Sequence, residues 1–155
     1  MFDAVLFDLD GTLADTAPDL CGTVNILLTE EGRPQQPFAS LRPHTSQGVR
    51  GLLGQGFGID SAHHEYERLA ARFLEIYAGQ LCDLSRLFDG IPDLLDVLES
   101  HGIAWGIVTN KRARYTEPLV AALGLVPRTR CVVSGDTTAE AKPSPLPILH
   151  ACQIL

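Results

Sequence analysis

The stretch AVLFDLDGTL, residues 4–13, decides how the rest of the chain is interpreted. Residues 4–7 form a continuous apolar run with β-branched and aromatic members, which predicts a strand buried on both faces of a parallel sheet. Two carboxylates, Asp8 and Asp10, follow the run, and Gly11 breaks it. Open parallel sheets bind their ligands at the carboxyl ends of the strands. We therefore expect Asp8 and Asp10 to lie at a binding edge.

The second half of the sequence predicts the other layers of an α/β fold. Helical patterns cover 91–101, 112–123 and 145–155, and strand patterns cover 103–108 and 131–133. Because helices and strands alternate here with short turns, the pattern predicts right-handed crossovers and a parallel sheet. The strand at 4–7 must join that sheet, since it has no other partner.

The segment between these parts contains helical patterns only. We expect one helix that begins near Asp15 or Thr16 and ends before Gly32, and two more at 46–55 and 61–79, with a loop over 33–43. The predicted architecture is a Rossmann-like α/β core with an inserted α-helical domain. The core comprises residues 1–15 and 86–155, and the insertion comprises residues 16–85.

Composition narrows the classes of partner. The 155 residues carry a formal net charge of −7, which argues against nucleic acid, because a phosphate backbone requires a basic face. No apolar stretch approaches the ~20 residues of a membrane span. The four cysteines are scattered, which favours free thiols in a reducing cytoplasm. Only two lysines occur, Lys111 and Lys142, so each of these positions is informative.

Polar side chains also follow the other two predicted strands. Thr109 and Asn110 come directly after the second strand, and the third leads into a polar loop that reaches Lys142. Together with the two acids, these residues offer a hydroxyl, an amide and an ammonium group at one edge of the sheet. We expect this set to act on a phosphoryl group.

The chemistry follows from the paired acids. Two neighbouring carboxylates repel each other unless a cation intervenes, and Mg²⁺ with its preference for oxygen ligands would relieve the repulsion. One carboxylate can attack phosphorus while the other handles the leaving-group proton. The hydroxyl and the ammonium would bind the equatorial oxygens, and Gly11 would let the backbone turn and present N–H groups to the anion.

Three motifs resemble those of the haloacid dehalogenase-like phosphohydrolases. The string DLDGTL at 8–13 looks like the first motif of this superfamily, VTN at 108–110 the second, and KP at 142–143 the third. The helical insertion lies where the superfamily places its cap. Within the superfamily, FDG at 88–90, VTNK at 108–111 and KPSP at 142–145 look most like phosphoglycolate phosphatase and N-acetylmuramic acid 6-phosphate phosphatase.

The resemblance implies a role for each residue in hydrolysis of a small phosphomonoester. Asp8 would be the nucleophile that forms an aspartyl-phosphate, and Asp10 the general acid and then the general base. The Asp8 side chain and the Asp10 backbone carbonyl would bind Mg²⁺. Thr109, Asn110 and Lys142 would hold the phosphoryl group.

One part of the superfamily pattern has no match in the sequence. A fourth acidic motif should follow a further strand, but nothing after Lys142 fits it, so we expect a shortened form of a longer phosphatase. Gly135-Asp136 resembles that motif but precedes Lys142; we expect Asp136 to pair with Lys142 or to cap a turn. A phosphate-binding module without activity and a phosphosugar mutase remain alternatives, and Lys111 is either a substrate contact or a surface residue.

Overall fold

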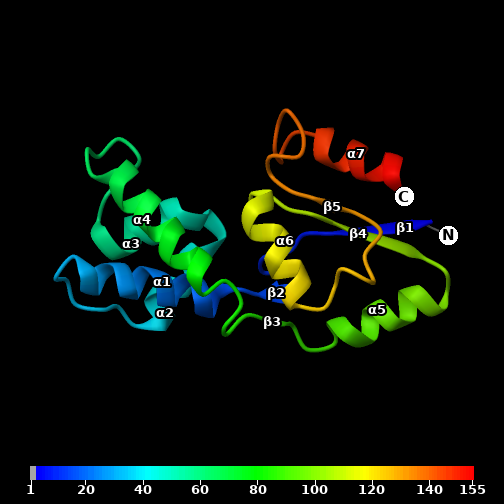
Figure 1. Ribbon diagram of the computed structural model, residues 1–155, viewed down its shortest axis with the longest axis horizontal. Coiled ribbons are helices and arrows are strands. Elements are labelled where there is room, and N and C mark those ends of the chain that lie inside the picture. The colour runs from blue at the N-terminus through cyan, green and yellow to red at the C-terminus, as the bar shows by residue number, and fades with distance from the viewer. Residues whose placement is uncertain (1–2) are drawn as a thin grey trace. The chain divides into compact units, whose positions relative to one another are not determined.

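The apolar run before Asp8 forms strand β1 (Ala4–Phe7) of a parallel sheet. The computed structural model describes residues 3–155. Strand β1 pairs with β4 (Ala104–Val108), and β4 pairs with β5 (Val132–Val133), both in parallel, which gives the order β1-β4-β5 (Figure 1). The predicted α/β fold with a parallel sheet is therefore confirmed.

Burial within this sheet differs between its strands. The central strand β4 is almost entirely buried, whereas every residue of β1 is partly exposed. The prediction that β1 is buried on both faces is therefore wrong. The reason is its place at the edge of this sheet, because an edge strand has a neighbour on one side only.

Helix α5 (Ile91–Ser100) precedes β4, and α6 (Ala113–Ala122) and α7 (Leu146–Ile154) follow β4 and β5. In Figure 1, α5 and α7 lie on either side of the strands. Ala151 of α7 is buried in an apolar cluster with Val108, Cys131 and Val133. Each helix begins or ends within one or two residues of its predicted boundary, because glycines and prolines mark these ends clearly.

A second, small sheet was not expected from the sequence. Strand β2 (Ala14–Asp15) pairs in antiparallel with β3 (Arg86–Leu87), and the Phe88 N–H donates to the Leu13 carbonyl at 3.0 Å. The chain leaves the α/β part at β2 and returns to it at β3. The dipeptides Ala14-Asp15 and Arg86-Leu87 belong to no apolar or alternating run, which is why the sequence does not reveal these strands, whereas the equally short β5 lies in an apolar run.

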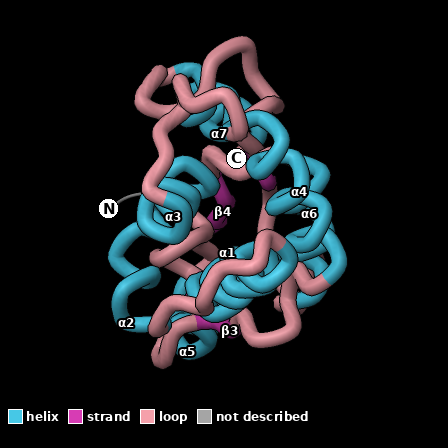
Figure 2. Tube along the Cα trace, turned by 90° about the vertical axis from the view of Figure 1, so that its left-hand side faces the viewer, coloured by secondary structure: helices cyan, strands magenta, loops and turns pink. Residues whose placement is uncertain are grey.

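The chain divides into two compact units, one of residues up to Asp15 with Arg86–Leu155, the other Thr16–Ser85. The second unit contains helices and loops but no strand among its residues (Figure 2). Its elements are α1 (Ala17–Glu30), α2 (Phe38–Leu41), the 3₁₀-helix η1 (Arg42–Gln47), α3 (Gly48–Phe57) and α4 (Tyr66–Gly79). Its core includes Leu27, Leu52 and Phe73, all fully buried.

Several boundaries in this unit differ from the expected ones. Helix α4 begins at Tyr66 and not at 61, because a turn precedes it in which the Asp60 carboxylate accepts the Ala62 N–H at 3.0 Å. Helices α2 and η1 occupy the predicted loop. Proline fits before or within the first turn of a helix, so Pro37 and Pro43 begin these short helices where we expected them to exclude helix.

A buried carboxylate joins the beginning of the helical unit to its end. Asp19 in the first turn of α1 is 3% exposed. It accepts the N–H groups of Leu84 and Ser85 at 2.9 and 2.8 Å and the Ser85 hydroxyl at 2.6 Å. Because three donors satisfy one carboxylate, this contact fixes the point at which the chain enters and leaves the unit.

Candidate active site

The Asp8 carboxylate lies at the end of β1 and faces a lysine. Its Oδ1 atom accepts the Leu9 N–H at 2.8 Å and lies 3.1 Å from Lys142 Nζ. The Asp8 side chain is 43% exposed, so solvent and small ligands can reach it. The residues predicted to act as nucleophile and phosphate ligand are thus in direct contact.

Three hydrogen bonds position Lys142. Its ammonium donates to the Val108 carbonyl at 2.7 Å. Its backbone N–H donates to Asn110 Oδ1 at 2.9 Å, and its carbonyl accepts Asn110 Nδ2–H at 2.9 Å. The Asn110 side chain was predicted to hold a phosphoryl group, but in this structure both its polar atoms bind the backbone of Lys142.

Thr109 lies at the end of β4 with 3% of its surface exposed. Its backbone N–H donates to the Val133 carbonyl at 2.9 Å, and its Oγ1 accepts the Lys111 N–H at 3.2 Å. The threonine therefore links the end of β4 to β5 and to the turn that follows.

The second carboxylate also contacts a lysine. Lys111 Nζ lies 3.1 Å from Asp10 Oδ1, with the two side chains 10% and 30% exposed. The sequence did not decide whether Lys111 contacts the substrate or is a surface residue. In the structure its ammonium group contacts the Asp10 carboxylate. The signals in the sequence were the scarcity of lysine and the place of Lys111 in the VTNK string at 108–111.

Gly11 provides the turn that the sequence predicts, with a positive φ of 76°. Its N–H donates to the Ala14 carbonyl at 2.8 Å, and the N–H groups of Thr12, Leu13 and Ala14 all donate to the Leu9 carbonyl. The Gly11 N–H that we expected to face an anion is therefore used within the turn itself. A β-carbon at this φ would be strained, so the turn requires glycine.

The segment Gly135-Asp136 supports the end of β4. The Gly135 N–H donates to the Lys111 carbonyl at 2.8 Å, and Asp136 Oδ1 accepts the Ala113 N–H at the start of α6, also at 2.8 Å. A β-carbon on Gly135 would collide with the Asn110 carbonyl. Asp136 was expected to pair with Lys142 or to cap a turn, and in the structure it accepts a backbone N–H at the start of α6.

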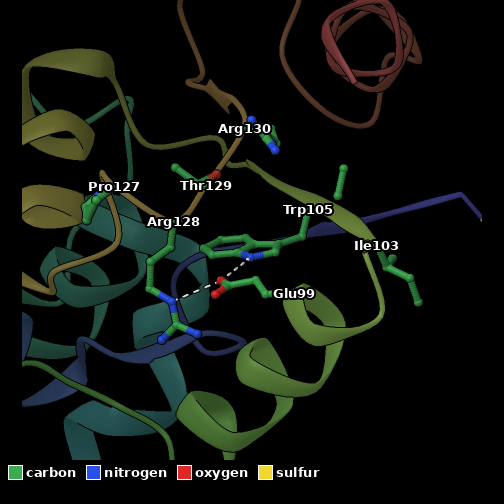
Figure 3. A pocket seen from close by; sticks show the side chains of 9 residues that line it. Glu99, Ile103, Trp105, Pro127, Arg128, Thr129 and Arg130 are labelled. Atoms are coloured by element: carbon green, nitrogen blue, oxygen red, sulfur yellow. Dashed lines mark hydrogen bonds and ion pairs between the residues drawn. The ribbon is translucent and has the colours of Figure 1, made fainter.

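A cavity of about 350 Å³ lies at the opposite end of β4 and takes no part in this site (Figure 3). There Glu99 accepts Trp105 Nε1–H and Arg128 Nε–H, both at 2.9 Å. The bond from Arg128, followed by that from Trp105, holds the pKa of Glu99 below its ordinary value. The glutamate thereby satisfies the polar atom of a buried tryptophan.

The acids at the end of β1 can be tested as ligands of Mg²⁺, the ion that the resemblance implies. Within residues 3–155, no three His, Cys, Asp or Glu side chains lie close enough together to hold a metal. The Asp8 carboxylate and the Asp10 carbonyl are nevertheless oxygen donors, and Mg²⁺ commonly takes one or two carboxylates and completes its shell with water and phosphate. The donors present therefore fit Mg²⁺ in company with a phosphate ligand.

The fold and the paired acids define an α/β protein with a helical insertion and a polar site at the carboxyl edge of its parallel sheet. The sequence profile described as "Haloacid dehalogenase-like hydrolase" matches residues 5–155. The chain belongs to this family. Within residues 3–155, no helix is long and apolar enough to cross a membrane.

Relatives that are named for an enzymatic activity are similar over nearly the whole chain. N-acetylmuramic acid 6-phosphate phosphatase of Pseudomonas aeruginosa is 41% identical over 98% of this chain and 67% of its own length. Phosphoglycolate phosphatase of Xanthomonas campestris pv. campestris is 46% identical over 96% of this chain and 66% of its own. The chain thus spans about two thirds of the length of these curated relatives.

A solved structure shows the same fold. The crystal structure of a predicted phosphoglycolate phosphatase from Haemophilus somnus superposes with a TM-score of 0.81 and is 26% identical in sequence. The match covers 98% of this chain and 71% of the other.

Proposed function

We propose that this chain carries the site of a Mg²⁺-dependent phosphatase that hydrolyses a small phosphomonoester, phosphoglycolate or a sugar phosphate. The observation that supports this proposal is that each of the two acids contacts a different lysine: Asp8 contacts Lys142, and Asp10 contacts Lys111. The relatives, named for phosphoglycolate and for N-acetylmuramic acid 6-phosphate, point to substrates of this class.

Asp8 is the nucleophile in this proposal. Its bonds to Leu9 and Lys142 both fall on Oδ1, so Oδ2 is the atom that attacks phosphorus. The P–O bond to the leaving group breaks as the Oδ2–P bond forms, and an aspartyl-phosphate results. Water then attacks phosphorus, releases inorganic phosphate and restores the Asp8 carboxylate.

Three other residues assist this reaction. Lys142 binds an oxygen of the transferring phosphoryl group, since its ammonium already lies beside the nucleophile. Thr109, at the end of the neighbouring strand, holds the phosphoryl group. Asp10 gives a proton to the leaving oxygen and later takes one from water. When bound to Asp8 and the Asp10 carbonyl, Mg²⁺ would neutralise charge on the phosphate.

The test is phosphate release from phosphoglycolate by the chain and by its Asp8→Asn variant, with Mg²⁺ and with a chelator. We expect Mg²⁺-dependent release by the chain and a loss of about 10³-fold or more in the variant, because an amide cannot replace the nucleophile. Asp93→Asn, which removes an exposed carboxylate of α5, is the matched control. Activity retained in Asp8→Asn would refute the assignment of the nucleophile.

One observation supports a second candidate, a phosphate-binding module without activity. Within residues 3–155 no third acid joins Asp8 and Asp10, so this site supplies Mg²⁺ with few charged ligands. Calorimetric titration with inorganic phosphate and Mg²⁺ distinguishes the two candidates. Binding of both ligands without any phosphate release would favour the module.

A further inference from the structure

We propose that Lys111 is a positioning residue that orients the Asp10 carboxyl group toward the leaving oxygen of the substrate. This inference rests on the proposed function. It starts from the contact between Lys111 Nζ and Asp10 Oδ1 at 3.1 Å, which is separate from the contact between Lys142 and Asp8.

The backbone of Lys111 is anchored on both sides. Its N–H donates to Thr109 Oγ1 at 3.2 Å. Its carbonyl accepts the Gly135 N–H at 2.8 Å and the Thr116 hydroxyl at 3.0 Å. Three elements, the end of β4, the loop after β5 and helix α6, therefore fix the point from which the lysine side chain extends.

The side chain itself is largely withdrawn from water. It is 10% exposed, and removing an ammonium group from water is costly unless an opposite charge compensates. The Asp10 carboxylate provides that charge. The Lys111 backbone is anchored and its side chain is largely covered by protein. Its ammonium group therefore restricts the Asp10 carboxylate to fewer orientations than solvent would allow.

Orientation matters for Asp10 because proton transfer requires the donor oxygen to lie within hydrogen-bond reach of the leaving oxygen. A displacement of about 1 Å can cost about 10²-fold in rate. The loss depends on the substrate: an alkoxide leaves poorly without a proton, whereas p-nitrophenolate leaves without one. Lys111 should therefore affect the two kinds of substrate differently.

The experiment compares phosphoglycolate with p-nitrophenyl phosphate in Lys111→Met, Lys111→Arg and the control Arg112→Gln, which removes an exposed charge next in the chain. We expect Lys111→Met to lower kcat by about 10- to 100-fold on phosphoglycolate and by less than about threefold on p-nitrophenyl phosphate. The arginine variant should recover most of the loss, and Arg112→Gln should match the unmodified chain.

Two kinetic outcomes overturn the proposal. An equal loss on both substrates means that Lys111 serves the fold or the phosphoryl group. A rise in KM for phosphoglycolate with kcat unchanged means that the lysine binds the substrate. Circular dichroism and the fluorescence of Trp105, the only tryptophan, show whether each variant is folded.

A second measurement needs no turnover. Because the chain has only two lysines, reductive ¹³C-methylation gives two lysine signals in an NMR spectrum, and Lys111→Arg assigns them. Asp10→Asn should shift the Lys111 signal alone, and Asp8→Asn the Lys142 signal alone. If Asp10→Asn leaves the Lys111 signal in place, the pairing and the proposal fail. If the pairing holds but the unmodified chain releases no phosphate, the proposed function fails, and the role of Lys111 with it.

Discussion

At the scale of single residues, Asn110 carries a function that its type alone does not reveal. An asparagine after a strand predicts a turn or a ligand contact, and both its polar atoms here bind the backbone of Lys142. Asp8 and Asp10 are placed where the sequence indicates, because their motif continues a strand. The contacts of Asn110 and Lys111 depend on the position of the loop after β5, which is distant in the sequence. The local sequence does not determine that position.

The substitution Asn110→Ala removes both bonds to Lys142. We expect the dissociation constant for inorganic phosphate to rise about tenfold, because Lys142 loses the support that holds its ammonium beside Asp8, a change of about 1.4 kcal/mol. Calorimetric titration measures this constant.

Asn25→Ala is the matched control for that experiment. Asn25 makes the same reciprocal pair of bonds with the Gln36 backbone, at 2.9 and 2.8 Å, within the helical unit. Both variants should lose about 1 kcal/mol of stability per bond at most, whereas only Asn110→Ala should weaken phosphate binding. Equal phosphate affinity in the two variants would contradict a positioning role for Asn110.

At the scale of elements, segments with an apolar or periodic pattern are predictable, and segments without one are not. The stripe of Leu69, Phe73 and Tyr77 predicts α4, and these three residues are its buried ones. Strands β2 and β3 have two residues each and exist because the chain passes twice through the same place. Neither dipeptide indicates that it pairs with the other, so a contact of this kind cannot be predicted from the sequence pattern.

The Asp19 contact should be essential to the helical unit. In Asp19→Ala, the buried N–H and hydroxyl groups of Ser85 lose their acceptor, and each buried unsatisfied donor costs about 1–3 kcal/mol. We expect the free energy of unfolding to fall by about 3 kcal/mol, measured by denaturant titration with far-ultraviolet circular dichroism. Ser85→Ala removes only the hydroxyl bond and should cost about 1 kcal/mol; equal costs would show that the backbone bonds contribute nothing.

At the scale of the whole molecule, the alternation of helix and strand after residue 85 was sufficient to predict the parallel sheet. The order of the strands was not predicted, and β1-β4-β5 is a finding of the structure. The composition of β1 is that of a central strand, and in the sheet that these residues form it lies at an edge. Burial therefore depends on the neighbours a strand acquires as well as on its own residues.

Each unit has its own core. We therefore expect a substitution that creates a cavity in one core to lower the stability of that unit alone. Phe73→Ala, in the helical unit, and Leu95→Ala, in the α/β unit, each remove a fully buried side chain and should cost about 3–5 and 2–5 kcal/mol. Trp105 belongs to the α/β unit, so its fluorescence follows that unit alone. Leu95→Ala should lower the midpoint of the Trp105 transition in denaturant. Phe73→Ala should leave that midpoint in place and lower the midpoint of a separate helical transition seen by circular dichroism. Equal shifts of the Trp105 midpoint in both variants would show that the units unfold together.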